Sequence, residues 1–253
     1  MKIADFEIGR QTFIIAEFGA NIFGGPSIKA TLQRFCQLAH ESGADAVKVQ
    51  MYKHTHFPKP EWGEKSQTEF PRELFPEFCD RAHSLGMAAG ASVFDDEAVA
   101  IVAEYGDFLK LATREANNEV LRNTCIKTGV PLIRSVDWRD ISTNREPYHA
   151  VRISMRNNIA TLGCVPIYPT PPRPEFLPFE LNVNLDNPCG WSSHSQGFVD
   201  VLCAVKEGAV IIEKHFCTHP SDYEARWSLH PRDFAEMVWC IRAMEQEQEW
   251  ADL

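Results

Sequence analysis

The sequence predicts an α/β protein of the (β/α)8 TIM-barrel class, with residues 1–253 forming a single domain. Eight short apolar runs alternate with helical patterns, which is typical of parallel strands joined by crossover helices. The length is also close to the roughly 250 residues of such barrels. An open doubly wound sheet is the alternative. It is less favoured because no glycine-rich nucleotide loop follows the first predicted strand.

The first half of the chain is expected to supply a hairpin and four strands. Residues 2–12 are predicted to form a short β-hairpin that turns at Gly9 and Arg10. Gly43 is predicted just beyond the first helix, because glycine adopts the left-handed conformation without a Cβ clash. The strands are predicted at 13–20, 46–52, 87–94 and 108–113. The helices are predicted at 28–42, 73–84, 96–104 and 118–127.

The second half completes the pattern with four more strands. These strands are predicted at 131–136, 159–168, 190–197 and 210–216, and the helices at 198–208 and 233–247. Between the fifth and sixth strands, residues 137–157 are polar and show only a weak helical pattern around 148–155. The last two strands and their helix form a βαβ unit, so their C-terminal ends should meet at one edge.

Polar residues at the strand ends form the candidate site, because chemistry in a TIM barrel sits at the C-terminal ends of the strands. They are Glu17, Asn21, Lys48, Gln50, Ser92, Lys110, Thr113, Ser135, Tyr168, Ser192, His194, Glu213 and His215. Side chains alternate along a strand, so His194 and His215 should lie side by side on neighbouring strands. Two such imidazoles are a candidate pair of ligands for a divalent metal, although isolated histidines are more often not ligands.

Two lysines lie inside predicted strands. Lys48 and Lys110 each have apolar neighbours on both sides, which places the lysines on the inner face of the barrel. A buried lysine is costly unless an anion accompanies it. Each lysine alone could belong to a structural ion pair, with Glu17 as one partner. Two lysines that converge with several hydroxyl groups instead favour a bound phosphate or carboxylate.

Composition limits the partners and the compartment. The formal net charge of -10 argues against a nucleic-acid or anionic-membrane surface, so positive charge for an anionic substrate must be local. The eight cysteines show no C-x-x-C spacing and are expected to be reduced and buried. There is neither an apolar signal core at the N-terminus nor a run long enough to span a membrane. These features predict a cytoplasmic protein.

Seven motifs in register resemble those of the sialic acid synthase family and cover nearly the whole chain. They are IAEFGAN (15–21), GADAVKVQ (43–50), FLKLAT (108–113), IYPTP (167–171), GWSSHS (190–195), IEKHF (212–216) and SLHP (228–231). The resemblance implies a (β/α)8 barrel that condenses phosphoenolpyruvate with an aldose, typically an N-acylmannosamine. The products are a 2-keto-3-deoxy sugar acid and phosphate.

The resemblance also assigns roles to individual residues. It implies a divalent metal held by His194 and His215, with manganese expected and magnesium or cobalt as alternatives, which activates the sugar aldehyde. The implied catalytic residues are Glu17, Gln50, Glu213 and Glu224. The implied substrate-binding residues are Asn21, Lys48, Ser92, Lys110, Thr113, Ser135, Tyr168 and Ser192.

The sequence departs from the family pattern mainly on the acceptor side. Ile22 and Ala225 replace family histidines, Pro166 replaces a polar residue, and Val136 and Asp137 interrupt a Ser-Thr-Gly segment. The chain also ends after the last barrel helix, so the family's C-terminal antifreeze-like domain is expected to be absent. The family's barrel usually pairs as a homodimer through contacts that include that domain, so the sequence leaves a homodimer open here without establishing the oligomeric state. These differences predict an intact phosphoenolpyruvate pocket with an altered acceptor.

Two other functions remain open from the sequence. One is a different metal-dependent reaction on the same barrel, such as aldol cleavage or isomerisation of a phosphorylated sugar. The other is a barrel without activity that serves as a binding subunit. Retention of Glu17, both lysines and both histidines favours catalysis, because buried charges without a ligand destabilise a fold.

Overall fold

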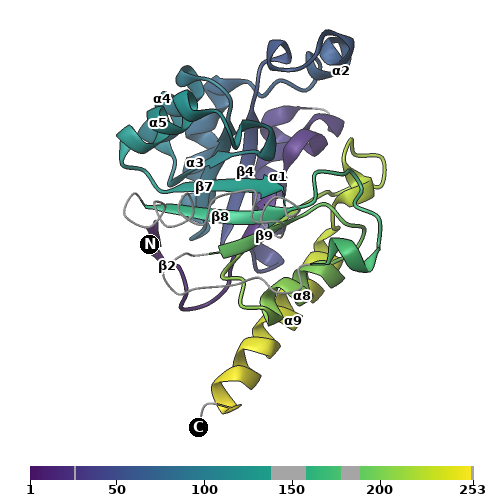
Figure 1. The fold of residues 1–253 in the computed structure, drawn as a ribbon. Coiled ribbons are helices and arrows are strands. Elements are labelled where there is room, and N and C mark those ends of the chain that lie inside the picture. Colours follow the sequence, from purple (N-terminus) through teal and green to yellow (C-terminus); the bar gives the residue numbers. More distant parts are fainter. Residues whose placement is uncertain (26, 138–157, 178–188, 252–253) are drawn as a thin grey trace.

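Eight parallel strands close into a barrel surrounded by helices (Figure 1) in the computed structural model, which describes residues 1–25, 27–137, 158–177 and 189–251. Around the barrel the strands follow the order β10-β3-β4-β5-β6-β7-β8-β9. They are β3 (Phe13–Glu17), β4 (Ala46–Met51), β5 (Ala88–Val93), β6 (Phe108–Leu111), β7 (Leu132–Asp137), β8 (Ile159–Cys164), β9 (Cys189–Ser193) and β10 (Ile211–His215). The predicted TIM barrel is confirmed.

The surrounding helices follow the predicted alternation with small shifts at their ends. They are α1 (Ile28–Glu41), α2 (Trp62–Lys65), α3 (Phe75–Ser84), α4 (Asp96–Tyr105), α5 (Glu119–Thr128), α8 (Val199–Lys206) and α9 (Pro231–Ala251). Gly43 follows α1 with φ +83°, as expected for a residue that ends a helix in the left-handed conformation. The weak helix predicted around 148–155 lies outside the described residues.

The N-terminal hairpin turns earlier than predicted. Its strands β1 (Lys2–Ile3) and β2 (Phe6–Glu7) pair antiparallel, so the turn falls at Ala4 and Asp5 rather than at Gly9 and Arg10. Packing decides this register, because Ile3 is buried and the Phe6 ring lies 5.2 Å from that of Phe13. A separate turn at Gly9 (φ +101°) then leads into β3.

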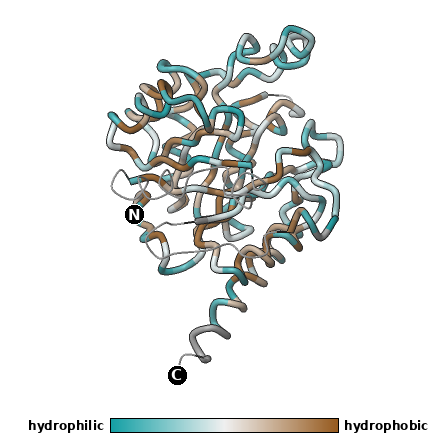
Figure 2. The backbone as a smooth tube through the Cα atoms, in the orientation of Figure 1, coloured by the Kyte–Doolittle hydropathy of each residue, from teal (hydrophilic) through white to brown (hydrophobic). Residues whose placement is uncertain are grey.

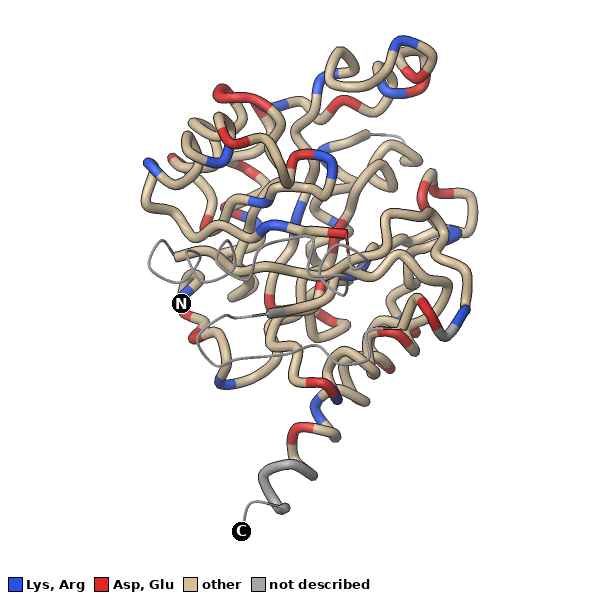
Figure 3. Tube along the Cα trace, in the orientation of Figure 1, with Lys and Arg blue, Asp and Glu red and all other residues tan. Residues whose placement is uncertain are grey.

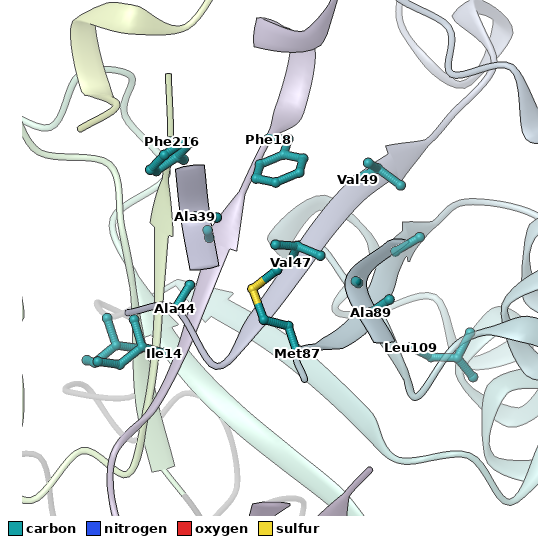
Figure 4. Close-up of a cluster of buried hydrophobic side chains, with 14 of the residues drawn as sticks. Ile14, Phe18, Ala39, Ala44, Val47, Val49, Met87, Ala89, Leu109 and Phe216 are labelled. Atoms are coloured by element: carbon teal, nitrogen blue, oxygen red, sulfur yellow. The ribbon is translucent and has the colours of Figure 1, made fainter. Parts of the chain in front are cut away.

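Apolar side chains occupy both faces of the strands. Outside the barrel they pack against the helices, where Phe18, Val47, Met87 and Phe216 belong to one large cluster (Figure 4). Inside, the N-terminal half of the barrel is filled by a second cluster: Ile3, Phe13, Ile15, Ala46, Ala88, Phe108, Ile133, Ala160, Leu162 and Ile211. Because this cluster fills the N-terminal half of the barrel, only the C-terminal half of the interior is open to polar groups.

The segment between β4 and α3 differs from the rest of the barrel. It contains the short helices His54–His56, Lys59–Glu61 and α2. It projects from the barrel near α2, where the chain is mostly hydrophilic (Figure 2). Among the described residues, no helix is both long and apolar enough to cross a membrane.

Candidate active site

A cavity of about 510 Å³ opens at the C-terminal ends of the barrel strands. Of the predicted site residues, all except Asn21 line it. They are Glu17, Lys48, Gln50, Ser92, Lys110, Thr113, Ser135, Tyr168, Ser192, His194, Glu213, His215 and Glu224. Alternation explains this result, because each strand turns every second side chain inward, as with Lys48 and Gln50 on β4.

The floor of the cavity is a buried network of two lysines and two glutamates. Lys48 pairs with Glu17, and its Nζ lies 3.8 Å from Glu213 Oε2. Lys110 Nζ donates to Glu213 Oε1 at 3.1 Å. The network spans β3, β4, β6 and β10, and each of the four side chains is at most 5% exposed. Opposite charges therefore accompany both lysines, as a buried cation requires.

Hydroxyl groups border this network. Ser92 Oγ accepts a hydrogen bond from Lys48 Nζ at 2.7 Å, and Ser192 Oγ donates to Glu213 Oε1 at 2.8 Å. Thr113 Oγ1 lies 2.8 Å from Cys164 Sγ. The buried hydroxyl of Ser135 has no hydrogen-bond partner among the described residues. A buried hydroxyl without a partner is uncommon, and a ligand in the cavity could supply one.

The pKa values in the floor follow from burial and charge. Burial raises the pKa of the Glu213 carboxyl, but the ammonium groups of Lys110 and Lys48 outweigh it and hold the pKa below its usual range. Burial lowers the pKa of Lys48 to about 7, against the raising effect of the Glu213 carboxylate. An anion that enters the floor would compete with these carboxylates for both lysines.

The two histidines lie beside this floor with their rings 5.4 Å apart. The Nδ1 atom of His194 lies 3.2 Å from the carbonyl oxygen of Val165, and Nδ1 of His215 lies 2.9 Å from Glu224 Oε2. Each Nδ1–H therefore donates to an oxygen, so Nε2 is the ring nitrogen that faces away from these two partners. Burial and the neighbouring His215 lower the pKa of His194, which keeps that ring neutral.

This arrangement fits a divalent metal. Metal-binding histidines usually donate their second ring N–H to a carboxylate or a backbone carbonyl, and both partners are present here. In the described part of the chain, no group of three or more His, Cys, Asp or Glu side chains is arranged to hold a metal. Water or substrate oxygens would therefore complete the coordination of an ion bound by this pair.

Asn21 lies behind the cavity and not in its lining. Its Nδ2 donates to the Phe216 carbonyl at 2.9 Å and to Ser228 Oγ at 3.0 Å, and its Oδ1 accepts from the Glu224 backbone N–H at 2.7 Å. The prediction that Asn21 contacts substrate therefore finds no support in this geometry. Asn21 instead fixes the segment that carries Glu224, because all three of its polar contacts are with the protein.

Gly19 allows Glu224 to approach. Its φ is +50°, and a Cβ at this position would overlap the Glu224 carboxylate. The backbone N–H of Gly19 also donates to Glu17 Oε1 at 2.6 Å. Glycine therefore serves two carboxylates of the site at once, from the turn that directly follows β3.

The mouth of the cavity contains residues that the sequence did not single out as site residues. They include Phe57, Glu61, Lys65, Phe94 and Trp227, together with Arg114, for which only its position gave a hint. Phe94 and Arg114 could have been found, because Phe94 directly follows β5 and Arg114 lies in the short turn after β6. Phe57, Glu61, Lys65 and Trp227 lie in short 3-10 or α-helical segments and loops without a periodic pattern.

The fold and the site together define a TIM barrel with a buried floor of two lysines and two glutamates beside a histidine pair. The NeuB family model matches residues 35–250, and the chain belongs to the NeuB family. The resemblance predicted from the seven motifs is thus confirmed.

Relatives with named activities are synthases. The chain is 28% identical to N-acetylneuraminate-9-phosphate synthase of Mus musculus, over 92% of this chain and 70% of that protein. It is 28% identical to pseudaminic acid synthase of Campylobacter jejuni, over 97% of this chain and 77% of that protein. An uncharacterized protein of Methanocaldococcus jannaschii is 32% identical, over 97% of this chain and 75% of that protein. The prediction of an enzyme is confirmed at the level of this family.

Solved structures agree with the fold. The spore coat polysaccharide biosynthesis protein of Bacillus subtilis has a TM-score of 0.82 at 28% identity, over 99% of this chain and 73% of that chain. A sialic acid synthetase from Leptospira borgpetersenii, crystallised with citrate, also has a TM-score of 0.82 at 24% identity, over 98% of this chain and 89% of that chain. At that identity the second comparison bears on the fold alone.

Proposed function

We propose that this protein condenses phosphoenolpyruvate with an aldose to give a 2-keto-3-deoxy sugar acid and phosphate. The observation that carries the proposal is the pair of buried lysines, Lys48 and Lys110, among hydroxyl groups at the C-terminal face of a NeuB-family barrel. Relatives named as sialic, pseudaminic and legionaminic acid synthases support the reaction class.

The floor suits the two anionic groups of phosphoenolpyruvate. Ammonium groups provide charge and hydroxyl groups provide directed donors, which together bind phosphate and carboxylate oxygens. The groups in question are Lys48, Ser92, Lys110, Thr113, Ser135 and Ser192, which converge from β4, β5, β6, β7, β9 and the turn after β6. Glu17 and Glu213 already pair with the lysines. Phosphoenolpyruvate that binds in the floor would therefore replace these carboxylates as the partners of the two ammonium groups.

The histidine pair would hold the metal. Val165 orients the ring of His194 and Glu224 orients the ring of His215, and each ring would bind the metal through its Nε2 atom. Manganese is the expected ion, with magnesium or cobalt as alternatives. When bound, a divalent ion supplies Lewis-acid polarisation of a carbonyl group. Tyr168 lies against His194, with the two rings 4.2 Å apart, and so borders the place where the acceptor aldehyde would arrive.

The bond changes define what the carboxylates must do. C3 of phosphoenolpyruvate bonds to the aldehyde carbon, whose oxygen gains a proton. Water adds at C2, and the C2–O bond to phosphate then breaks. A carboxylate near C2 can accept the proton of that water, and Glu17 and Glu213 lie in the floor for this role. Gln50 and Glu224 also line the cavity, where they can hydrogen-bond acceptor hydroxyl groups.

Phosphate release from phosphoenolpyruvate tests the proposal. The purified chain would be assayed with manganese and a panel of aldoses, alongside His194→Ala and a chelated sample. We expect release that depends on both the acceptor and the metal, and loss of at least about 100-fold in the variant. Metal-dependent aldose conversion without phosphoenolpyruvate would favour an aldolase or isomerase. Ligand binding without any turnover would favour a binding subunit.

Two further expectations from the sequence remain predictions. The first is that the protein acts in the cytoplasm, and the second is that a homodimer is one possible assembly. Size-exclusion chromatography with light scattering would measure the assembly directly.

A further inference from the structure

Lys214 is a fully buried charged residue to which the proposed reaction gives no role. It lies on β10 between two residues that line the cavity, and because side chains alternate along a strand, Lys214 points to the outer face of the barrel. Its Nζ donates to Ser193 Oγ at 3.0 Å and to the Ser195 carbonyl at 2.6 Å. The ammonium group therefore contacts the residues on both sides of His194.

His194 lies beyond the end of the regular sheet. β9 ends at Ser193, whose register partner Lys214 is the last in the ladder between β9 and β10. On the other side, the ladder between β8 and β9 ends one residue earlier, at Cys164 and Ser192. The regular ladders therefore do not fix the backbone of His194.

Three hydrogen bonds continue where the ladders stop. The Thr170 N–H donates to the His194 carbonyl at 2.8 Å. Lys214 donates to the carbonyl of the next residue, Ser195, and the Ser195 hydroxyl donates to the Asp200 carboxylate on α8. Hydrogen bonds that involve a charged group are stronger than neutral ones, so Lys214 and Asp200 should contribute most to holding this turn.

The position of the backbone matters because little else fixes His194. Its ring makes one hydrogen bond in the described part of the chain, from Nδ1 to the Val165 carbonyl at 3.2 Å, and its centroid lies 5.4 Å from that of His215. This bond orients the ring but leaves the backbone free to move. Ordering a residue costs conformational entropy, and a preformed site avoids that cost when its ligand binds.

We propose that Lys214 is a positioning residue for the histidine pair. Through the Ser195 carbonyl it holds the backbone of His194 opposite His215, so that both rings can bind one divalent ion. The inference rests on the proposed function, because it takes the two histidines to bind a metal. Neither Lys214 nor Ser195 is among the described residues that line the cavity, so both act from behind the barrel wall.

Calorimetric titration of manganese into the metal-free protein tests this role without turnover. The wild type would be compared with Lys214→Met and with Lys206→Met, a matched control at an exposed lysine on α8. Asp45→Asn controls for a general loss of stability. Asp45 accepts hydrogen bonds from the Ile14 N–H and from Arg242, each at 2.9 Å, just before β4 at the opposite end of the barrel. Thermal unfolding would be measured for each variant.

In Lys214→Met, we expect manganese affinity to fall by about 10-fold, at the lower end of what is usual when support of a metal-binding histidine is lost. Phosphoenolpyruvate affinity should stay within about threefold of the wild type, since Lys48 and Lys110 of the floor are unchanged. Lys206→Met and Asp45→Asn should bind manganese as the wild type does, even if Asp45→Asn unfolds at a lower temperature.

Ser195→Ala provides a second, milder variant, which carries the test if Lys214→Met does not fold. It removes the hydroxyl group that donates to Asp200 but leaves the buried ammonium group and its partners in place. We expect manganese affinity to fall by about threefold or more in this variant, again with phosphoenolpyruvate affinity within about threefold of the wild type.

Unchanged manganese affinity in Lys214→Met, or in Ser195→Ala where Lys214→Met does not fold, would overturn the inference. An equal loss in Asp45→Asn, or a parallel loss of phosphoenolpyruvate affinity, would also overturn it, because either result indicates general loosening of the barrel. In these cases acceptor-dependent phosphate release by the wild type would still support the proposed function. A wild type that binds no manganese, magnesium or cobalt would count against the proposed function itself, and the inference would fail with it.

Discussion

Glu224 links the turn after β3 to the histidine pair. Its Oε2 accepts a hydrogen bond from His215 Nδ1 at 2.9 Å, and its carboxylate occupies the space that Gly19 leaves open. The side chain of Glu224 is 14% exposed, and its backbone N–H is held by Asn21. A short chain of contacts thus sets the orientation of the His215 ring.

Glu224→Gln tests this contact at the residue scale. The amide can still accept the Nδ1–H, but it removes the negative charge that strengthens His215 as a ligand. We expect manganese affinity to fall by about 10- to 100-fold, as is usual for outer partners of metal-binding histidines. Titration of the metal-free protein by calorimetry measures this. Glu236→Gln, an exposed position on α9, is the matched control, and equal affinities in the two variants would contradict the assignment.

At the scale of elements, hydrogen bonds on the outer face of the barrel stabilise the neighbouring strands β9 and β10. Ser192 and His194 face the cavity, while Trp191, Ser193 and Ser195 take part in a network on the outer face. Lys214 Nζ donates to Ser193 Oγ at 3.0 Å and to the Ser195 carbonyl at 2.6 Å. The Asp200 carboxylate on α8 accepts from Trp191 Nε1 at 2.8 Å. This network fixes the strand register that turns Ser192 and His194 inward.

Lys214→Met should weaken this support. The substitution keeps much of the volume but removes the ammonium group that donates to Ser193 and Ser195 and whose charge interacts with Asp200. We expect the free energy of unfolding to fall by about 3 kcal/mol, a typical cost of removing one member of a buried charge network. Urea unfolding measures it, with Lys206→Met on the exposed face of α8 as the control. If both variants lose the same small amount, the network does not stabilise this part of the barrel.

A second element-scale prediction concerns the start of α4. Asp95 caps this helix by accepting the Ala98 N–H at 2.8 Å, and it receives two hydrogen bonds from Arg72 at 3.0 and 2.7 Å. Burial raises the Asp95 pKa, but the hydrogen bonds from Arg72 and Ala98 outweigh it and hold the pKa below its usual value. The contribution of the charge is therefore present above the unfolded-state pKa and is lost as pH falls through the folded-state pKa.

Asp95→Asn isolates that charge, because asparagine can still cap the helix. Near neutral pH we expect the variant to be less stable by about 1 kcal/mol, since hydrogen bonds to a carboxylate are stronger than those to an amide. Below about pH 4, where the unfolded carboxyl is already protonated, the difference should shrink. Urea unfolding at a series of pH values measures this, and a difference that does not change with pH would contradict it.

At the scale of the whole molecule, the barrel was predictable because its signal is repeated. Eight apolar runs, most of them followed by a helical pattern, define one architecture even where individual ends shift by up to four residues. The hairpin turn was predicted wrongly, since Gly9 suggested a turn but the packing of Ile3 and Phe6 fixes the turn at Ala4 and Asp5. Local turn preferences cannot reveal contacts with distant residues.

The site was predictable wherever a strand carries the residue. Alternation along β4 or β10 fixes which side chains point inward, so Lys48 and Glu213 followed from the register. Residues that reach the cavity from loops, such as Phe57 and Trp227, did not follow from it because a loop has no such period. Asn21 shows the converse, since its motif suggested substrate contact while its hydrogen bonds go to the protein.

The negative net charge of the molecule means that an anionic substrate must be attracted by local positive charge in the floor of the cavity. The net charge is -10, and charged positions of both signs are interspersed over the molecule (Figure 3). The surface as a whole therefore does not attract an anion, and the proposed affinity for phosphoenolpyruvate would have to come from the buried lysines. Recruitment of the proposed anionic substrate therefore depends on that local affinity.

Calorimetric titration of phosphoenolpyruvate into the wild type, Lys110→Met and Lys127→Met tests this claim most directly. Lys127 is an exposed lysine on α5 and provides the matched control. The account predicts saturable binding at one site in the wild type and in Lys127→Met, and binding weaker by about 100-fold in Lys110→Met, whose buried charge is lost. Absence of binding in the wild type, or equal binding in all three proteins, would contradict it.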